Sequence, residues 1–229
     1  METSKASVVI LCGGKGIRLR PLTKYLPKPL ININKKPILQ YIINHILKYN
    51  FTEFYIATGY KSDKIEKFMS SKFEALKYKI INSGNVEIIY RIREVIKYLK
   101  NDFILCYGDT ICDMDLFNLE KFHFTDPSTI TMATYPIQIP FGVLTLDNNH
   151  YAKSFEEKPM LNEVINIGYF YIPKEYFSYF LKYETFVDVL TSLSSNKKIK
   201  CFKHDGSHIT VNTIAELENA NDKVKELFT

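Results

Sequence analysis

The chain has 229 residues, of which 46% are hydrophobic and 24% are charged, and its nine Gly and nine Pro exclude a collagen-like or low-complexity protein. Its longest uninterrupted apolar run, residues 8–12, is far shorter than the roughly 20 residues that cross a bilayer, so we expect no transmembrane helix and no membrane partner. Basic residues exceed acidic residues by five without forming a dense stripe, which favours small anionic substrates over nucleic acid.

The first half of the chain alternates between strand-like and helix-like segments. Residues 7–12 (SVVILC) contain a continuous apolar run, as in a strand buried on both faces, and end at Gly13 and Gly14. After Pro37, apolar residues recur at helical spacing from Ile38 to Tyr49. Further strands are expected at residues 53–58, 78–81 and 103–107, and further helices at residues 62–73, with Ser62 as the cap, and 88–99. This alternation predicts βαβ units around a parallel sheet.

The second half has shorter, strand-rich segments and two helices with recognisable starts. Strands are expected at residues 129–135, 143–146, 152–156, 165–172 and 199–202, some of them antiparallel. Thr185 with Asp188 and Thr213 with Glu216 form capping-box patterns, the second opening a helix that ends near residue 227. Because no linker or internal repeat interrupts the pattern, we predict a single α/β domain over residues 1–229. Its core is a Rossmann-like, mostly parallel mixed sheet flanked by helices.

Open parallel sheets bind ligands beyond the carboxyl ends of their strands, which directs attention to the loop after residue 12. Three glycines, Gly13, Gly14 and Gly16, let the backbone approach a phosphate closely, and Arg18 adds a fork of donors. Lys28 is held between two prolines nearby, where it suits a phosphate. The loop fits neither the Walker A nor the dinucleotide-binding pattern. A surface turn with incidental basic residues is the structural alternative, and the position after a buried strand favours phosphate binding.

Residues 11–19 (LCGGKGIRL), followed by residues 26–30 (LPKPL), resemble the signature of the sugar-phosphate nucleotidyltransferases. The resemblance continues in order through residues 107–110 (YGDT), 140–143 (PFGV), 155–159 (FEEKP), 166–169 (NIGY) and 211–213 (VNT). Within this family the chain is most similar to glucose-1-phosphate cytidylyltransferases. The resemblance implies the nucleotide-diphospho-sugar transferase fold and transfer of CMP from CTP, or of another nucleotide from its triphosphate, to a small phosphorylated acceptor.

The resemblance also implies roles for individual residues. Catalysis would involve Arg18, Lys28 and Lys158, and Mg²⁺ would be held by Asp109 and Asn212. The nucleotide would be bound by Leu11, Cys12, Gly13, Gly14, Lys15, Gly16, Arg18, Lys28, Gly59, Asn82, Gly84, Gly108 and Asp109. The acceptor would be bound by Gly142, Glu157, Lys158, Asn166 and Gly168. The structural alternatives are a turn cap for Asp109 and an exposed strand end for Lys158.

Two departures from the family pattern bear on metal and acceptor. Asn212 stands where relatives usually have Asp, so the metal affinity is expected to fall or the ion to shift toward Asp109. The short connection at residues 82–85 lacks a Gly-rich insertion. A non-sugar acceptor, such as phosphoglutamine or phosphocholine, could therefore be bound by Asn82, Asn85 and one of two arginines, Arg91 or Arg93. The alternative for the arginines is that they are solvated helix residues. A non-catalytic nucleotide-binding regulatory module is the alternative of another class.

The remaining polar and sulfur-containing residues are expected to be structural. We interpret His45, Cys12 and Cys106 as core residues, and Asp113 and Asp115 as turn residues or a helix cap. The four cysteines have no metal-ligand spacing, and the N-terminal residues do not resemble a secretory signal. These patterns favour a cytoplasmic protein with reduced thiols, and they allow a homo-oligomer.

Overall fold

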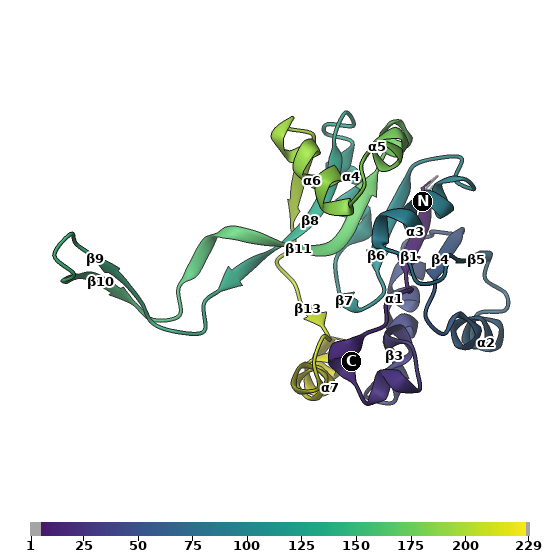
Figure 1. Cartoon of the computed structure of the whole chain (residues 1–229), viewed down its shortest axis with the longest axis horizontal. Coiled ribbons are helices and arrows are strands. Elements are labelled where there is room, and N and C mark those ends of the chain that lie inside the picture. Colours follow the sequence, from purple (N-terminus) through teal and green to yellow (C-terminus); the bar gives the residue numbers. More distant parts are fainter. Residues whose placement is uncertain (1–5, 228–229) are drawn as a thin grey trace.

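The computed structural model describes residues 6–227 of the chain; residues 1–5, where part of the signal-peptide expectation falls, and residues 228–229 lie outside the described part. A seven-stranded sheet in the order β12-β8-β11-β6-β1-β4-β5 forms its centre (Figure 1). The parallel half consists of β1 (Ser7–Leu11), β4 (Phe54–Thr58), β5 (Tyr78–Asn82) and β6 (Phe103–Tyr107). The mixed half consists of β8 (Ile130–Gln138), β11 (Met160–Ile172) and β12 (Ile199–Lys203), with β11 antiparallel to both β6 and β8.

Helices cover both faces of this sheet, as the continuous apolar strands predict. Val8 and Ile10 of β1 belong to one apolar cluster, and Val9 between them belongs to the other. The first cluster contains residues of α1 (Ile38–Leu47), α2 (Ser62–Lys72), α4 (Leu116–His123) and α7 (Ile214–Leu227). The second contains residues of α3 (Ile88–Ile96), α5 (Phe177–Lys182) and α6 (Phe186–Ser195). The predicted fold class, an α/β fold with a mostly parallel mixed sheet between helices, is confirmed.

Most predicted elements are present, and the differences have local physical reasons. Both capping boxes form, at Thr185 and at Thr213, and Asp115 caps α4. Ser62 is not the cap of α2. It is the first helical residue, and its hydroxyl contacts Thr58 and Glu66, while Lys61 precedes the helix in a left-handed conformation. The short helices α4 and α5 were not predicted from the sequence.

Short elements after β1 and β6 shape the region where these strands end. After β1 the chain forms three 3-10 turns, Ile17–Leu19, Leu22–Lys24 and Lys28–Leu30, and a small pair, β2 (Asn32–Ile33) and β3 (Lys36–Pro37). After β6, β7 (Thr110–Cys112) pairs with β13 (His208–Thr210). This second pairing carries the start of α7, Ile214, to the end of β6, Tyr107, more than a hundred residues away in sequence. No helix within the described residues is both long and apolar enough to cross a membrane.

A long two-stranded ribbon projects from the sheet, and residues 136–165 of it are called the arm here (Figure 1). The neighbouring strands stop at its base, because β12 pairs with β8 only up to Thr134 and β6 pairs with β11 only from Tyr169. Beyond that point β8 and β11 pair only with each other, and the tip is the hairpin of β9 (Val143–Leu146) and β10 (Ala152–Glu156). The four predicted strands of this region are present, but β9 and β10 lie wholly on the arm, and β8 and β11 each run from the body onto it.

Candidate active site

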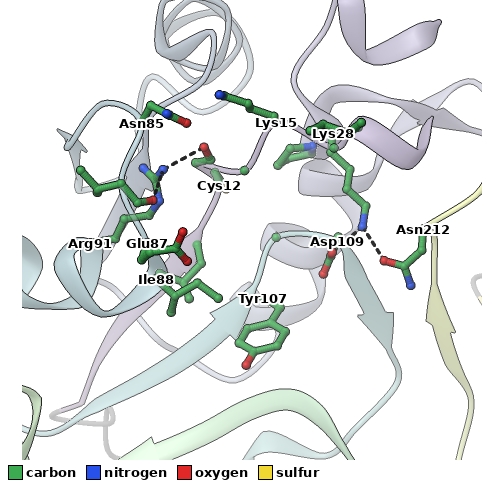
Figure 2. A pocket seen from close by; sticks show the side chains of 18 of the residues that line it. Cys12, Lys15, Lys28, Asn85, Glu87, Ile88, Arg91, Tyr107, Asp109 and Asn212 are labelled. Carbon is green, nitrogen blue, oxygen red and sulfur yellow. Dashed lines mark hydrogen bonds and ion pairs between the residues drawn. The ribbon is translucent and has the colours of Figure 1, made fainter. Parts of the chain in front are cut away.

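A pocket of about 530 Å³ lies at the carboxyl ends of β1 and β6, where a ligand is expected in a sheet of this kind (Figure 2). The loop after β1, the turn after β6, the start of α3 and the segment before α7 all contribute to it. Its lining residues are Leu11, Cys12, Gly13, Gly14, Lys15, Gly16, Ile17, Arg18, Lys28, Pro29, Asn85, Val86, Glu87, Ile88, Arg91, Tyr107, Gly108, Asp109 and Asn212. Ten of the thirteen residues predicted to bind the nucleotide are therefore in one cavity.

The guanidinium of Arg91 fixes the glycine loop to the neighbouring strand ends. It donates hydrogen bonds to the carbonyl oxygens of Thr58 at 2.5 Å, Gly13 at 3.0 Å and Val86 at 2.9 Å. A side chain on Gly13 would lie 2.0 Å from this guanidinium, and one on Gly59 would lie 2.3 Å from it. The two glycines thus make room for the arginine, and the arginine shapes the loop that lines the pocket.

This contact corrects the expectation for the two arginines of α3. Arg91 is 4% exposed, and burial lowers the pKa of its guanidinium. Arg93 donates to the carbonyl oxygens of Phe180 and Tyr183, away from the pocket. Both guanidinium groups already donate hydrogen bonds to backbone oxygens, so neither is available to bind the carboxylate of an acceptor. Neither arginine is a solvated helix residue.

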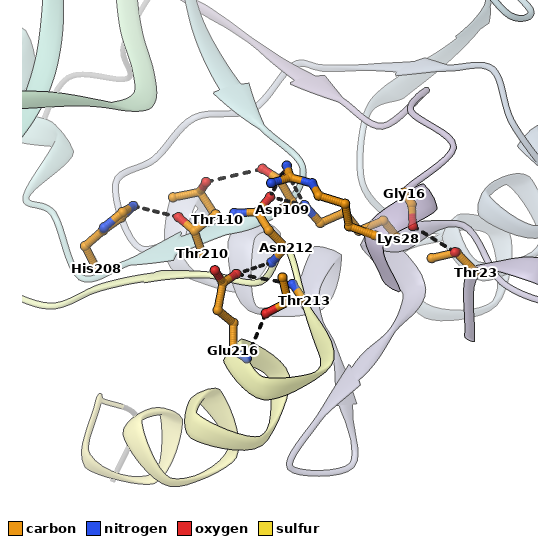
Figure 3. Close-up of polar contacts among 11 residues, drawn as sticks. Gly16, Thr23, Lys28, Asp109, Thr110, His208, Thr210, Asn212, Thr213 and Glu216 are labelled. Carbon is orange, nitrogen blue, oxygen red and sulfur yellow. Dashed lines mark hydrogen bonds and ion pairs between the residues drawn. The ribbon is translucent and has the colours of Figure 1, made fainter. Parts of the chain in front are cut away.

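A compact polar cluster lies at the other side of the pocket, around Lys28 (Figure 3). Its ammonium contacts the Asp109 carboxylate at 2.5 Å and the Asn212 side-chain oxygen at 3.0 Å. The Arg18 guanidinium donates to the same Asn212 oxygen at 3.1 Å. The rigid turn at Pro27 and Pro29 holds Lys28 with only 9% of its surface exposed. The two cations of this cluster therefore lie next to the glycine loop, and cations of this kind bind phosphate. The Asp109 carboxylate pairs with one of them.

The C-terminal capping box positions Asn212 in this cluster. The Glu216 carboxylate accepts hydrogen bonds from the backbone N–H groups of Asn212 at 2.5 Å and Thr213 at 3.3 Å, and the Thr213 hydroxyl accepts from the Glu216 N–H. The backbone N–H of Val211 also donates to the Asp109 carbonyl. The cap thus places the Asn212 amide at the end of β6 and leaves its oxygen free to face Lys28.

The oxygen atoms around Lys28 fit a metal ion only in part. Asp109 supplies a carboxylate and Asn212 supplies an amide oxygen, both of which are hard ligands of the kind that Mg²⁺ prefers. Within residues 6–227, no three His, Cys, Asp or Glu side chains converge as a metal-binding set. The residues present therefore fit a magnesium ion that takes its other ligands from substrate phosphates and water, rather than one enclosed by protein.

Asn166 and Gly168 lie next to the pocket and support one of its walls. The Asn166 side chain accepts a hydrogen bond from the Gly168 N–H at 2.8 Å, where β11 shifts its register against β8. Gly168 has a φ of +79°, and a side chain there would lie 2.5 Å from the Tyr107 ring. Burial raises the pKa of the Tyr107 hydroxyl, and a hydrogen bond with Asn166 opposes that shift. The sequence pattern at these residues thus has a structural reason, the packing of Tyr107 against a bulged strand.

Six other predicted residues lie outside the pocket lining. Gly59, Asn82 and Gly84 lie behind it: the Asn82 side chain accepts from the Gly84 N–H at 3.0 Å, and a side chain on Gly59 would lie 2.2 Å from the Gly84 oxygen. Gly142, Glu157 and Lys158 are on the arm, where Lys158 keeps 59% of its side chain exposed and its ammonium lies 4.0 Å from the Glu157 carboxylate. Acceptor binding by these arm residues remains a prediction.

Sequence reasoning missed the side of the pocket formed by Glu87 and Ile88, and it assigned no binding role to Tyr107, the first residue of the YGDT motif. Figure 2 shows Glu87 and Ile88 beside Arg91, across the pocket from Lys28, Asp109 and Asn212. Their only sequence signal is their position directly after a strand end and a short turn. The core interpretations hold, since Cys12, Cys106 and His45 are all buried, and burial raises the pKa of the Cys12 thiol and lowers that of His45.

Comparison with known proteins agrees with this architecture. Residues 7–205 match the family model described as nucleotidyl transferase. A probable glucose-1-phosphate cytidylyltransferase from Bacillus subtilis is 29% identical over 93% of this chain and 94% of its own length. A D-glycero-alpha-D-manno-heptose 1-phosphate guanylyltransferase from Campylobacter jejuni is 32% identical over 78% of this chain and 80% of its own. The crystal structure of HddC from Yersinia pseudotuberculosis has the same fold, with a TM-score of 0.74 and 23% identity over 96% of this chain and 99% of its own. The chain therefore belongs to the nucleotidyl transferase family of enzymes.

Proposed function

We propose that this enzyme transfers CMP from CTP to a sugar 1-phosphate and releases pyrophosphate. A phosphate oxygen of the acceptor attacks the α-phosphorus of the triphosphate and forms a new P–O bond. The bond from that phosphorus to the bridging oxygen breaks, and the electron pair leaves with pyrophosphate. The observation that carries this proposal is the convergence of Lys28, Arg18 and Asp109 beside the glycine loop.

Positioning and charge neutralisation account for most of the catalysis in such a reaction. We assign the backbone around Gly13 and Gly14 to the nucleotide, Arg18 to the β- and γ-phosphates, and Lys28 to the transferring phosphate. The prolines on either side of Lys28 restrict its backbone, so its ammonium needs little reorganisation when charge builds up on the phosphorus oxygens. The short distance between Lys28 and Asp109 supports this role, because it keeps the ammonium oriented before substrate arrives.

Members of the family typically use a divalent metal, and we propose Mg²⁺ here. Asp109 and the side-chain oxygen of Asn212 would hold it together with substrate phosphates. Bound there, the ion would neutralise phosphate charge and align the reacting groups. Lys28 contacts both of these oxygens, so the chain's own contribution is to keep the two ligands within reach of one another.

The choice of CTP follows from the Glu87 side of the pocket and from the relative in Bacillus subtilis. With the phosphates beside Lys28, the base would lie toward Glu87. A carboxylate accepts a hydrogen bond from the N4 amino group of cytosine, and it repels the O4 oxygen that uracil carries at the same position. Glu87 therefore favours cytosine over uracil. Because similar enzymes are named for guanylyl and uridylyl transfer, the assay described below includes all four nucleoside triphosphates.

The acceptor is proposed to be a sugar 1-phosphate, the substrate type in the names of the similar enzymes. Gly142, Glu157, Lys158 and Asn166 are proposed to bind it, with Lys158 on its phosphate. The non-sugar alternative now rests on the short connection between β5 and α3 alone, because Arg91 and Arg93 bind backbone oxygens. A cytoplasmic location stays a prediction from the sequence.

Pyrophosphate release from each of the four nucleoside triphosphates, assayed with a panel of sugar and non-sugar phosphates, tests this proposal. CTP with a sugar 1-phosphate is expected to give the highest kcat/KM. Triphosphate binding without pyrophosphate release, with every acceptor, would favour the alternative of a non-catalytic regulatory module. That alternative has less support, since the residues assigned to phosphate and metal lie together in one cavity.

A further inference from the structure

The strand β13, which leads directly to Asn212, is held by a very short pairing. It has three residues, and among the described residues it pairs only with β7, which also has three. A two-stranded pair of this kind is at best marginally stable by itself. Because each strand residue advances the chain by about 3.4 Å, a slip of two residues would move Asn212 by about 7 Å. The position of Asn212 therefore depends on what fixes β13 to β7.

The apolar side chains of this pair exclude only some of the possible registers. Ile209 lies opposite Ile111, and both are buried. A slip of one residue would turn Ile209 to the opposite face, which burial forbids. A slip of two residues would instead place Val211 opposite Ile111, and Val211 is also apolar. Apolar packing thus allows a two-residue slip, and another interaction has to exclude it.

A group of hydrogen bonds closes the end of the pair that lies farther from Asn212. The Asp113 carboxylate accepts from the Ser207 N–H at 2.8 Å, and the Ser207 carbonyl accepts from the Asp113 N–H at 3.4 Å. The His204 Nε2 atom lies 3.1 Å from both the Ser207 carbonyl and the Asp113 carboxylate. Because both neighbours are acceptors, Nε2 carries the hydrogen and donates it. Asp113, His204 and Ser207 are called the clasp here.

The clasp is anchored to the central sheet through His204. This residue directly follows β12, and its N–H donates to the carbonyl oxygen of Thr134 on β8 at 2.8 Å. Only 7% of its side chain is exposed, and its ring packs near that of Tyr135, with the centroids 6.0 Å apart. The clasp therefore joins the edge of the central sheet to both β7 and β13, and it fixes one strand relative to the other.

The turn before β13 contains one residue that makes room for the clasp and one that takes no part in it. A side chain on Gly206 would collide with the Asp113 carboxylate and with the His204 ring. Asp205 next to it pairs with Lys203 at 2.9 Å, and these two side chains keep 72% and 63% of their surface exposed. The turn thus offers both a variant that disturbs the clasp and a matched control.

We propose that Asp113 and His204 are positioning residues for Asn212. By fixing β13 on β7, they hold the Asn212 side-chain oxygen beside Asp109, and this role rests on the proposed function, in which both residues hold Mg²⁺. The clasp secures one end of β13, and the Val211 N–H secures the other by donating to the Asp109 carbonyl. Neither Asp113 nor His204 lines the pocket, so both act through Asn212.

Asp113→Ala tests this role through the Mg²⁺ dependence of pyrophosphate release. Residues that orient a metal ligand typically change metal affinity by 10- to 100-fold, so the Mg²⁺ concentration for half-maximal activity is expected to rise about tenfold. A purely structural loss would lower kcat by reducing the active fraction and would leave this midpoint unchanged. Asp113→Asn keeps an acceptor oxygen and is expected to stay close to wild type. Asp205→Ala removes a carboxylate from the same turn and is expected to leave the midpoint unchanged.

Combining Asp113→Ala with Asn212→Ala shows whether the clasp acts through Asn212. Two substitutions that affect one interaction are not additive, so the double variant is expected to have the same Mg²⁺ midpoint as Asn212→Ala alone. If the two shifts multiply instead, the clasp acts on the reaction by another route and the proposal is wrong. An unchanged midpoint in Asp113→Ala would also overturn it.

Hydrogen–deuterium exchange of residues 207–213 gives a measurement that needs no turnover. Backbone amides of this segment are expected to exchange faster in Asp113→Ala and at the wild-type rate in Asp205→Ala. Faster exchange with an unchanged Mg²⁺ midpoint would leave the clasp a purely structural feature and overturn the positioning role. If Asp113→Ala does not fold, Gly206→Ala replaces it, because it disturbs the same contacts.

Failure of the proposed function gives a different result. If wild-type protein releases no pyrophosphate with any substrate pair, the proposed function fails and the clasp is judged on exchange alone. In that case faster exchange in Asp113→Ala would support its hold on β13, and an unchanged rate would contradict it.

Discussion

The Lys28 ammonium lies 2.5 Å from the Asp109 carboxylate, although the two residues are 81 positions apart in the chain. This contact joins the loop after β1 to the turn after β6, and Asn212 adds the segment before α7. The Lys28 side chain keeps only 11% of its surface exposed, and that of Asp109 keeps 29%. One ion pair thus marks the place where three distant segments meet beside the glycine loop, and where we expect the transferred phosphate.

Asp109→Ala is expected to lower kcat by roughly 1,000-fold at saturating Mg²⁺ while the protein stays folded. The carboxylate would hold a metal that stabilises phosphate charge by several kcal/mol, and no other carboxylate lines the Lys28 side of the pocket. Steady-state kinetics with a circular dichroism melt check this. The control is Asp63→Ala on α2, an exposed acidic residue that should have wild-type kinetics. Near-normal turnover of Asp109→Ala would remove the metal role.

Arg91→Met is expected to destabilise the protein by about 3 kcal/mol. It leaves three carbonyl oxygens without their charged donor, in a place where water has little access. Arg18→Ala should behave in the opposite way, because Arg18 is exposed. It should change stability by less than about 0.5 kcal/mol and raise the KM for the triphosphate. Urea unfolding and initial rates on both variants separate the two roles, and an equally unstable Arg18→Ala would contradict them.

The contrast between these arginines shows what could be predicted from the sequence. Buried strands precede the glycine loop with its constrained Lys28 and the Gly-Asp turn. Because the ends of parallel strands meet at one edge of the sheet, these features could be expected at one site. Arg91 was misinterpreted because a charged residue early in an amphipathic helix normally faces solvent. Its burial depends on the space that Gly13 and Gly59 leave, a tertiary relationship between three separate segments.

The arm could not be predicted for a similar reason. Alternating residues such as those of Val143–Leu146 have the same pattern whether a strand lies inside a sheet or extends beyond it. The position at which the ribbon leaves the sheet is set by where its neighbouring strands end, and both β6 and β12 end before the ribbon does. The position of Asn212 was easier to expect, because the capping box at Thr213 fixes the start of α7 directly after it.

Glu87→Gln is expected to lower the preference for CTP over UTP by about tenfold in kcat/KM. A glutamine amide can donate to the O4 oxygen of uracil, which a carboxylate repels. Competition assays with both triphosphates measure the ratio. Glu74→Gln, at an exposed glutamate in the turn after α2, is the control and should leave the ratio unchanged. An unaltered ratio in Glu87→Gln would show that the base is read elsewhere.

Asn212→Asp is expected to lower the Mg²⁺ concentration needed for half-maximal activity. The substitution keeps the oxygen that faces Lys28 and adds a negative charge beside Asp109, and hard cations bind more tightly as the number of carboxylate ligands rises. A magnesium titration of activity at fixed triphosphate measures this effect. Asn212→Ala should shift the titration the other way, and a titration that neither variant moves would exclude Asn212 as a ligand.

The screen of four triphosphates against sugar and non-sugar phosphates tests the central claim most directly. We predict pyrophosphate release with CTP and a sugar 1-phosphate, at a kcat/KM well above that with UTP or with phosphocholine and phosphoglutamine. Lys28→Ala is expected to abolish this release. Higher kcat/KM with another triphosphate, or with a non-sugar phosphate, would contradict the claim.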